Sequence, residues 1–297
     1  MNGEDQGRVS AEQMEHFVRE GFLRIEGVVE DSKVDAALRQ INHALGKPGA
    51  LSSGGAQHNL GKLDGIYSSR TEIRDLLFGA DGAQWLFDAF APTTQYKQRD
   101  LKFWWGRASP QIAIRFPEVP ESLFRVLATT EMVERGEAWH TDGLRKSKLH
   151  PFSLLVGVCL SDCIGDFQGN LLLWPGKHLL IHKCLNNKGG DNFLRKFNKT
   201  SMQQGQGLGK REEDYIPLDN LPSLPALGKP RHIYLKKGDI VLLHPDLPHS
   251  GGSNWGSQIR IMVYFRVQLS DDMEGHKNHA FNDFNESLRK LADRVLE

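Results

Sequence analysis

The chain has 297 residues, 39% of them apolar and 25% charged, a composition typical of globular proteins with a large core. Its 37 basic and 37 acidic side chains balance, so no overall field favours nucleic acid or an anionic membrane. Three sparse cysteines indicate free thiols, and no membrane-length apolar run, secretory or transit signal or peroxisomal C-terminus is present. We therefore expect a soluble cytoplasmic protein, with no nucleic-acid or membrane partner and an oligomeric state left open.

The first ninety residues carry helical patterns. Ser10 and Gln13 have the spacing of a capping box before an amphipathic segment, and Gly21 predicts where that helix ends. A brief extended run follows at 22–29. Further helices are predicted over residues 31–45, 71–79 and 81–90.

From about residue 95 to residue 268 the sequence favours strands. Apolar runs separated by Gly, Pro, Asn and Asp clusters are typical of an antiparallel β architecture. We expect strands within residues 111–117, 151–162, 169–176, 231–245 and 259–269. A polar insert at about 183–230 is long enough to be a lid or a binding loop.

The chain closes with an amphipathic helix over residues 281–297, whose apolar stripe is expected to pack on the core. These patterns predict a single domain over residues 1–297, mainly β with flanking helices. A β-sandwich or a jelly roll (double-stranded β-helix, cupin-like) with its core at about 95–268 fits them, covered by an N-terminal helical layer and the C-terminal helix.

Two His-x-Asp pairs stand out, His140 with Asp142 and His244 with Asp246. Chance alone accounts for about one such pair in a chain of this composition, so the motif by itself does not identify a metal site. The stretch downstream of the second pair carries another histidine, His249, and then a strand that begins near Arg260. A non-haem iron(II) oxygenase requires two histidines and one carboxylate that leave three coordination positions open.

An oxygenase of this kind with a dicarboxylate cosubstrate also needs a cation deeper in the β-barrel, to bind the cosubstrate's far carboxylate. Arginine suits this role because its guanidinium grips a carboxylate with two parallel hydrogen bonds and stays charged. At this point the sequence resembles the phytanoyl-CoA dioxygenase-like family of iron(II)- and 2-oxoglutarate-dependent oxygenases. The matching stretches are "FVREGFLRIEGVV", "WHTDG", "GNLLLWPGKH" and "HSGGSNWGSQIR", in the family's order. The eleven positions from His249 to Arg260 equal the family's spacing of distal histidine and arginine.

The resemblance implies a dioxygenase that hydroxylates a small-molecule substrate and uses Fe(II), 2-oxoglutarate and O2. His140, Asp142 and His249 would be the catalytic iron ligands, and Arg260 would bind the far carboxylate of 2-oxoglutarate. Ser250 and Ser253 are both candidates for a hydroxyl beside that carboxylate. The pair His244/Asp246 is then expected to play no part in the metal site.

Other polar residues are assigned less specifically. Gln111 and Arg115 lie on one face of a predicted strand and could line the substrate pocket or serve the structure. His178 and His182 follow a Pro-Gly turn and are expected at the surface. Basic residues of the insert could meet the phosphates of a CoA-like group or form the solvated face of a lid; they are Lys183, Lys188, Arg195, Lys196 and Lys199.

Two other classes of function compete with the oxygenase. One is a jelly-roll hydrolase or isomerase that uses the same metal ligands, with Arg260 binding a substrate anion. The other is a catalytically silent metal-binding protein. Activity with zinc and without oxygen would indicate the hydrolase.

Overall fold

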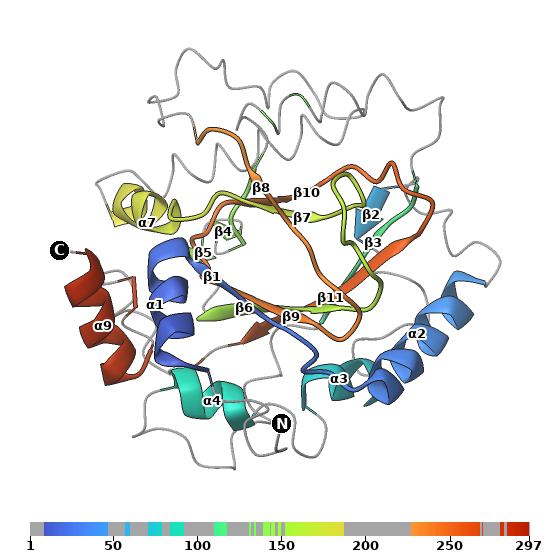
Figure 1. The fold of residues 1–297 in the computed structure, drawn as a ribbon, viewed down its shortest axis with the longest axis horizontal. Helices are drawn as coiled ribbons and strands as arrows, with labels where there is room; N and C mark the ends of the chain where they lie inside the picture. Colours follow the sequence, from blue (N-terminus) through green and yellow to red (C-terminus); the bar gives the residue numbers. More distant parts are fainter. Residues whose placement is uncertain are drawn as a thin grey trace.

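The protein combines antiparallel sheets with helices that cover them (Figure 1). The computed structural model describes residues 9–46, 57–59, 71–78, 84–91, 110–117, 131, 134, 139–142, 144–145, 148–149, 152–186, 227–267, 269, 280–281 and 284–296. The helices are α1 (Ala11–Glu20), α2 (Asp31–Leu45), α3 (Thr71–Phe78), α4 (Gln84–Phe90), α7 (His178–Asn186) and α9 (Glu286–Leu296). The strands are β1 (Phe22–Ile25), β2 (Gln57–Asn59), β3 (Gln111–Arg115), β4 (Leu144–Arg145), β5 (Lys148–Leu149), β6 (Leu154–Cys159), β7 (Leu171–Leu173), β8 (Arg231–Ile233), β9 (Ile240–Leu243), β10 (His249–Gly251) and β11 (Arg260–Val267).

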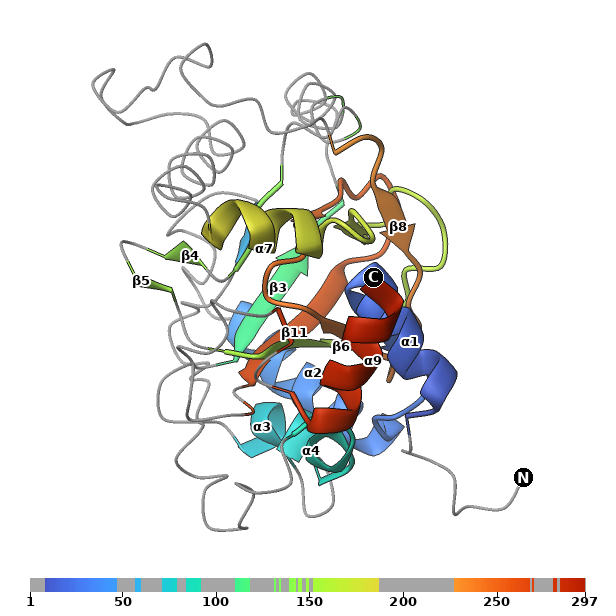
Figure 2. The same ribbon diagram turned by 90° about the vertical axis from the view of Figure 1, so that its left-hand side faces the viewer.

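Two sheets form the framework. The larger has the order β1-β9-β6-β11-β3-β2, the smaller has the order β10-β7-β8, and β4 pairs with β5. Every pairing is antiparallel. The larger sheet lies between the smaller sheet and helices α3 and α4 (Figures 1 and 2). The predicted mainly β architecture with flanking helices is therefore confirmed.

The N-terminal helix begins and ends where the sequence predicts. The Ser10 hydroxyl accepts a hydrogen bond from the Gln13 backbone N–H, and the Gln13 side chain accepts one from the Ser10 N–H. Gly21 ends α1 in the left-handed region, at a φ of 77°. The chain then enters β1, which pairs with β9 at the edge of the larger sheet.

Strand β11 shows why the central strands are apolar along their whole length. Ile261, Val263 and Phe265 join the core that the larger sheet forms with the helices. Met262 and Tyr264 face the opposite way, into a second core shared with residues of the smaller sheet. Because alternate side chains enter different cores, both faces of the strand exclude water.

The C-terminal stripe packs on the core, as predicted. Phe281, Phe284 and Leu288 are buried in the same cluster as Phe17 of α1. Helix α9 begins only at Glu286, so the two phenylalanines precede the helix rather than belong to it. Figure 2 shows α9 lying against α1.

A buried carboxylate fixes β1 to the turn before β9. Asp239 accepts hydrogen bonds from the Arg24 guanidinium at 2.8 and 3.1 Å and from the backbone N–H groups of Gly27 and Lys236, each at 2.9 Å. Gly238 precedes it at a φ of 86°, and a Cβ there would lie 2.7 Å from the Val29 carbonyl oxygen. The turn therefore requires glycine at this position.

Two elements differ from the sequence-based expectation. Residues 249–251 lie between the predicted strands 231–245 and 259–269 but form β10, which pairs with β7 and carries His249 into the sheet. Helix α7 was not predicted; it begins at His178, before the 183–230 insert, and its last four residues form the start of that insert. The rest of that insert up to residue 226 lies outside the described residues, including all of its named basic residues except Lys183. No helix within the described part of the chain is long and apolar enough to cross a membrane.

Candidate metal centre

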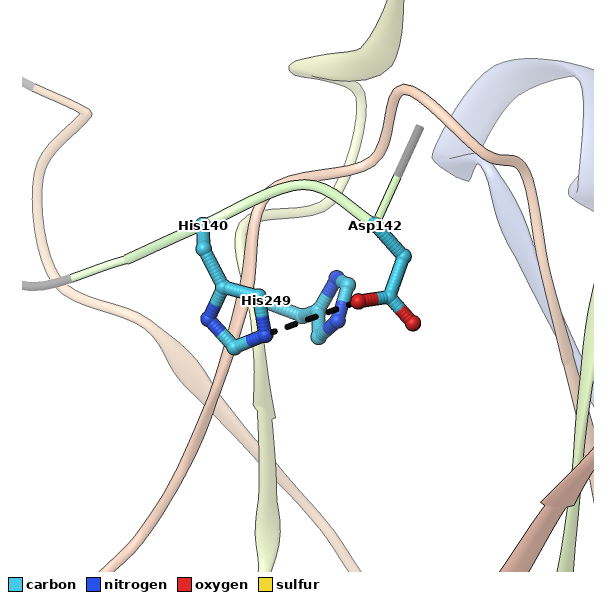
Figure 3. Close-up of side chains that lie close together, drawn as sticks. All are labelled: His140, Asp142 and His249. Carbon is cyan, nitrogen blue, oxygen red and sulfur yellow. Dashed lines mark ion pairs between the residues drawn. The ribbon is translucent and has the colours of Figure 1, made fainter. Parts of the chain in front are cut away.

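Three of the predicted residues converge at one place. His140, Asp142 and His249 each offer a donor atom, and these atoms all lie within 4.8 Å of one another. The Nε2 atom of His140 is 3.9 Å from Oδ1 of Asp142, and the two imidazole ring centres are 4.4 Å apart (Figure 3). Among the described residues this is the one group of three or more such side chains with metal-binding spacing.

Backbone pairing brings these side chains together. The His140 N–H donates to the His249 carbonyl oxygen at 2.9 Å, and the His249 N–H donates to the His140 carbonyl oxygen at the same distance. This single bridge aligns the segment around His140 with β10, which is held in turn by β7. The geometry therefore rests on the smaller sheet.

A backbone carbonyl orients the ring of His249. Its Nδ1 atom lies 2.9 Å from the Leu247 carbonyl oxygen, which can only accept a hydrogen bond. Nδ1 must therefore carry the proton, which leaves the Nε2 lone pair available to a metal. His249 is also buried, so the ring is held firmly.

His140 is neutral at physiological pH. Burial lowers its pKa to about 3, and the nearby His249 ring contributes in the same direction, while Asp142 opposes both. A metal ion needs an unprotonated imidazole nitrogen. The site therefore presents His140 in its ligating form without having to remove a proton.

The carboxylate of Asp142 lies between the histidines and an arginine. Its Oδ2 atom accepts a hydrogen bond from Nη2 of Arg266 at 2.6 Å, and the same Nη2 donates to Oε1 of Gln111 at 3.0 Å. Gln111, one of the proposed substrate residues, is thus linked to Asp142 through Arg266. The sequence analysis did not single out Arg266, although it lies on the same face of β11 as Arg260, six positions further along the strand.

Arg260 and Arg115 are cross-strand partners on β11 and β3. Arg260 is buried; its Nε donates to the Gly169 carbonyl oxygen at 2.5 Å and its Nη1 to the Ala113 carbonyl oxygen at 3.3 Å. A surface ion pair is therefore not its role. The Arg115 guanidinium lies against Gly251, two positions after His249, and a Cβ on Gly251 would overlap its Nη2.

The two candidate serines lie in different environments. Ser250 follows His249 on β10, and alternation along a strand places its side chain on the opposite face from the His249 ring. Ser253 lies beyond the strand, where its carbonyl oxygen accepts a hydrogen bond from the Gly169 N–H at 2.9 Å. Gly169 is also the residue that Arg260 contacts. Gly169 thus links the Ser253 backbone to the Arg260 side chain.

The second His-x-Asp pair lies outside the metal centre. Both nitrogens of the His244 ring have backbone partners, the Ala280 carbonyl oxygen at 2.7 Å and the Asp246 N–H at 3.2 Å. The Asp246 carboxylate lies 3.0 Å from Nδ1 of His182. The expectation that His178 lies at the surface is wrong: the ring is fully buried and lies 3.1 Å from the Val18 carbonyl oxygen, because α7 packs on the end of α1.

The three side chains fit a divalent iron ion. Two imidazoles and one carboxylate are the donor set of non-haem iron(II) oxygenases. Donors about 2.1 Å from a metal and at right angles to each other lie about 3 Å apart. His140 Nε2 and Asp142 Oδ1 lie 3.9 Å apart, somewhat farther than in a metal-bound pair.

Comparison with known proteins identifies the family. The family model for phytanoyl-CoA dioxygenase (PhyH) matches residues 17–262, most of the chain and all three residues of the candidate centre. The chain belongs to this family. Phytanoyl-CoA dioxygenase family proteins depend on Fe(II), 2-oxoglutarate and O2, so the predicted family and cofactors are confirmed. Among curated proteins, none matches the sequence.

Several solved structures are similar at low identity. The carbocyclase SnoK from nogalamycin biosynthesis, described as non-haem and α-ketoglutarate dependent, is 15% identical, with a TM-score of 0.48 over 87% of this chain and 84% of that one. EvdO2 from Micromonospora carbonacea var. aurantiaca, complexed with 2-oxoglutarate, is 17% identical, with a TM-score of 0.45 over 90% and 97%. AviO1 from Streptomyces viridochromogenes Tue57 is 16% identical, with a TM-score of 0.45 over 89% and 95%. At these scores the likeness adds nothing to the functional argument, which rests on the family and the site.

Proposed function

We propose that this member of the phytanoyl-CoA dioxygenase family hydroxylates a small-molecule substrate, with conversion of 2-oxoglutarate to succinate and CO2. The observation that carries the proposal is the convergence of His140, Asp142 and His249 from two distant segments within 4.8 Å. Family membership supports an Fe(II)- and 2-oxoglutarate-dependent oxygenase; the hydroxylation outcome is our inference.

In this proposal His140, Asp142 and His249 hold the iron, and Arg260 holds the far carboxylate of 2-oxoglutarate. Iron(II) with 2-oxoglutarate supplies the oxidation of an unactivated C–H bond by O2. The chain contributes the neutral imidazole of His140, the His249 imidazole held by a backbone hydrogen bond, one carboxylate, and a buried guanidinium fixed at two of its nitrogens. A site that holds its ligands in advance loses little free energy to reorganisation when cosubstrate binds.

The position of Arg115 supports a role in substrate or cosubstrate binding. Its guanidinium lies beside β10 near His249, and it lowers the pKa of His140 together with Arg266. A cation this close to the centre is suited to an anionic group. Gln111 lies on the same face of β3 as Arg115 and reaches the centre through Arg266.

We further propose that the two sheets are the two halves of a double-stranded β-helix and that residues 1–297 form one domain. The second core supports this architecture, because residues of both sheets pack in it. In such a fold the metal ligands lie at one open end and the arginine lies deeper between the sheets. The 183–230 insert is proposed to act as a lid.

The test is succinate formation from 2-oxoglutarate by the iron-loaded protein in air, measured with and without candidate substrates. We expect turnover that requires both iron(II) and O2 and that is absent when zinc replaces iron. Turnover of a substrate with zinc and without O2 would instead indicate the hydrolase or isomerase.

The role of Arg260 is tested separately. Arg260→Ala should weaken 2-oxoglutarate binding about 10–100-fold, the value of a lost charge-assisted pair of about 1.5–3 kcal/mol. Arg260→Lys, which keeps the charge without the planar fork, is the matched control and should have a smaller effect. An unchanged affinity in Arg260→Ala would show that another group holds the far carboxylate.

A further inference from the structure

Asp142 makes a short contact with a residue outside the group of candidate ligands. Nη2 of Arg266 donates to Oδ2 of Asp142 at 2.6 Å, while Oδ1 faces the Nε2 atom of His140 at 3.9 Å. Only 10% of the Arg266 side chain and 13% of the Asp142 side chain are exposed. The two carboxylate oxygens therefore have different partners, one toward the donor cluster and one toward a buried cation.

Arg266 is itself held from two further sides. The same Nη2 atom donates to Oε1 of Gln111 at 3.0 Å, and the guanidinium carbon lies 6.0 Å from the centre of the Phe152 ring. Gln111 and Arg266 come from β3 and β11, neighbouring strands of the larger sheet. Asp142, in contrast, comes from the segment that is bridged to β10 of the smaller sheet. The contact thus joins a metal-ligand candidate to the opposite sheet.

We infer that Arg266 is a positioning residue that keeps Asp142 a one-oxygen ligand of the iron. This inference rests on the proposed function, in which three protein donors must leave three coordination positions open. Two of these are needed by 2-oxoglutarate and one by O2. A carboxylate that chelated the metal with both oxygens would occupy one of them. Arg266 occupies Oδ2 with a charge-assisted hydrogen bond and so opposes chelation.

The sign of the effect on metal binding separates this role from simple support. Groups that orient ligands usually strengthen metal binding, and their loss weakens it about 10–100-fold. Arg266 should act in the opposite direction, because its positive charge lies close to the cation and withdraws electron density from the carboxylate. Without Arg266, the hydrogen bond that opposes chelation by Asp142 would be lost, so the metal would bind as tightly as before or more tightly while 2-oxoglutarate lost a position.

The experiment is anaerobic calorimetry of iron(II) binding to the apoprotein, followed by 2-oxoglutarate binding to the iron-loaded protein. In Arg266→Met we expect unchanged or tighter iron binding and 2-oxoglutarate binding that is about 10–100-fold weaker. Arg266→Lys, which keeps the charge, should lose less than about tenfold. Gln111→Ala should shift both affinities in the same directions by a smaller factor, since it removes a support of Arg266. The control is Arg231→Met on β8, whose side chain is 56% exposed and pairs with Glu20 at 3.8 Å; both affinities should stay as in the wild type.

Three results would overturn the inference, and they differ from one another. Equal 2-oxoglutarate affinity in the wild type and Arg266→Met would show that Arg266 does not keep Asp142 from occupying a second coordination position. Weaker iron binding together with a lower melting temperature that added iron does not restore would show a purely structural role. A wild-type protein that binds iron but no 2-oxoglutarate would remove the proposed function, and this inference with it.

Discussion

Truncating each of two histidines, His249 and His244, should separate metal binding from stability. They lie five positions apart. His244 belongs to the second His-x-Asp pair, whereas His249 is grouped with the first pair, His140 and Asp142. His249 is one of the three residues of the candidate centre. His244 is 1% exposed and packs against Phe281, with ring centres 5.1 Å apart. His244→Ala removes a buried ring and leaves the Ala280 carbonyl oxygen without its hydrogen bond.

The magnitudes follow from these environments. Removal of a buried aromatic-sized side chain destabilises by about 3–5 kcal/mol, so His244→Ala should lower the melting temperature by roughly 5–15 °C. Its iron affinity at a temperature where it is folded should match the wild type. His249→Ala also removes a buried ring and a hydrogen bond worth about 1 kcal/mol, so it too should lower the melting temperature. Unlike His244→Ala, it should weaken iron binding by at least about 100-fold, more than the loss of an orienting group.

The assays are thermal unfolding of the apoproteins and anaerobic iron(II) titration at 20 °C or below. The reasoning is refuted if His249→Ala binds iron within about tenfold of the wild type. It is equally refuted if folded His244→Ala loses iron binding, because the metal would then lie at the other motif.

Three further predictions concern single positions. Burial lowers the pKa of His178 from 6.5 to about 4, so between these pH values the folded protein binds fewer protons than the unfolded chain. The free energy of unfolding should therefore fall by about 3 kcal/mol as the pH drops from 6.5 to 4. Denaturant unfolding of His178→Asn should show a shallower pH dependence, and an equal slope would contradict this. Gly238→Ala should destabilise by about 1–3 kcal/mol because of the positive φ and the close Val29 carbonyl oxygen, and an unchanged denaturation midpoint would refute it. Gly251→Ala should displace the flexible end of Arg115, with little change in melting temperature but an altered 2-oxoglutarate affinity; calorimetry that showed no change would separate Arg115 from cosubstrate binding.

The elements that the sequence predicted best are those with a strong repeating pattern. Strands β6, β9 and β11 are apolar on both faces, and helix α1 carries a capping box and a terminal glycine. Strand β10 has only the residues His249, Ser250 and Gly251 and no apolar pattern, so only its pairing with β7 makes it a strand. Helix α7 has buried Ile181 on one side, but the surrounding polar insert obscured its pattern.

The site followed the same division. His140, Asp142 and His249 could be named because their types and spacing follow a family pattern along the chain. Arg266 could not, because its contact with Asp142 spans 124 positions and depends on how the segment around His140 lies over the larger sheet. His178 was misplaced for a related reason: its burial comes from the packing of α7 on α1, which no local pattern shows.

The central claim is that the cluster of His140, Asp142 and His249 binds iron together with 2-oxoglutarate. The most direct measurement is an anaerobic titration of the apoprotein with iron(II) and then 2-oxoglutarate, followed by visible absorption. We predict a metal-to-ligand charge-transfer band that saturates at one iron per chain and is absent in His249→Ala. Iron binding without the band would contradict the cosubstrate assignment, and the lack of any iron binding would contradict the metal centre itself.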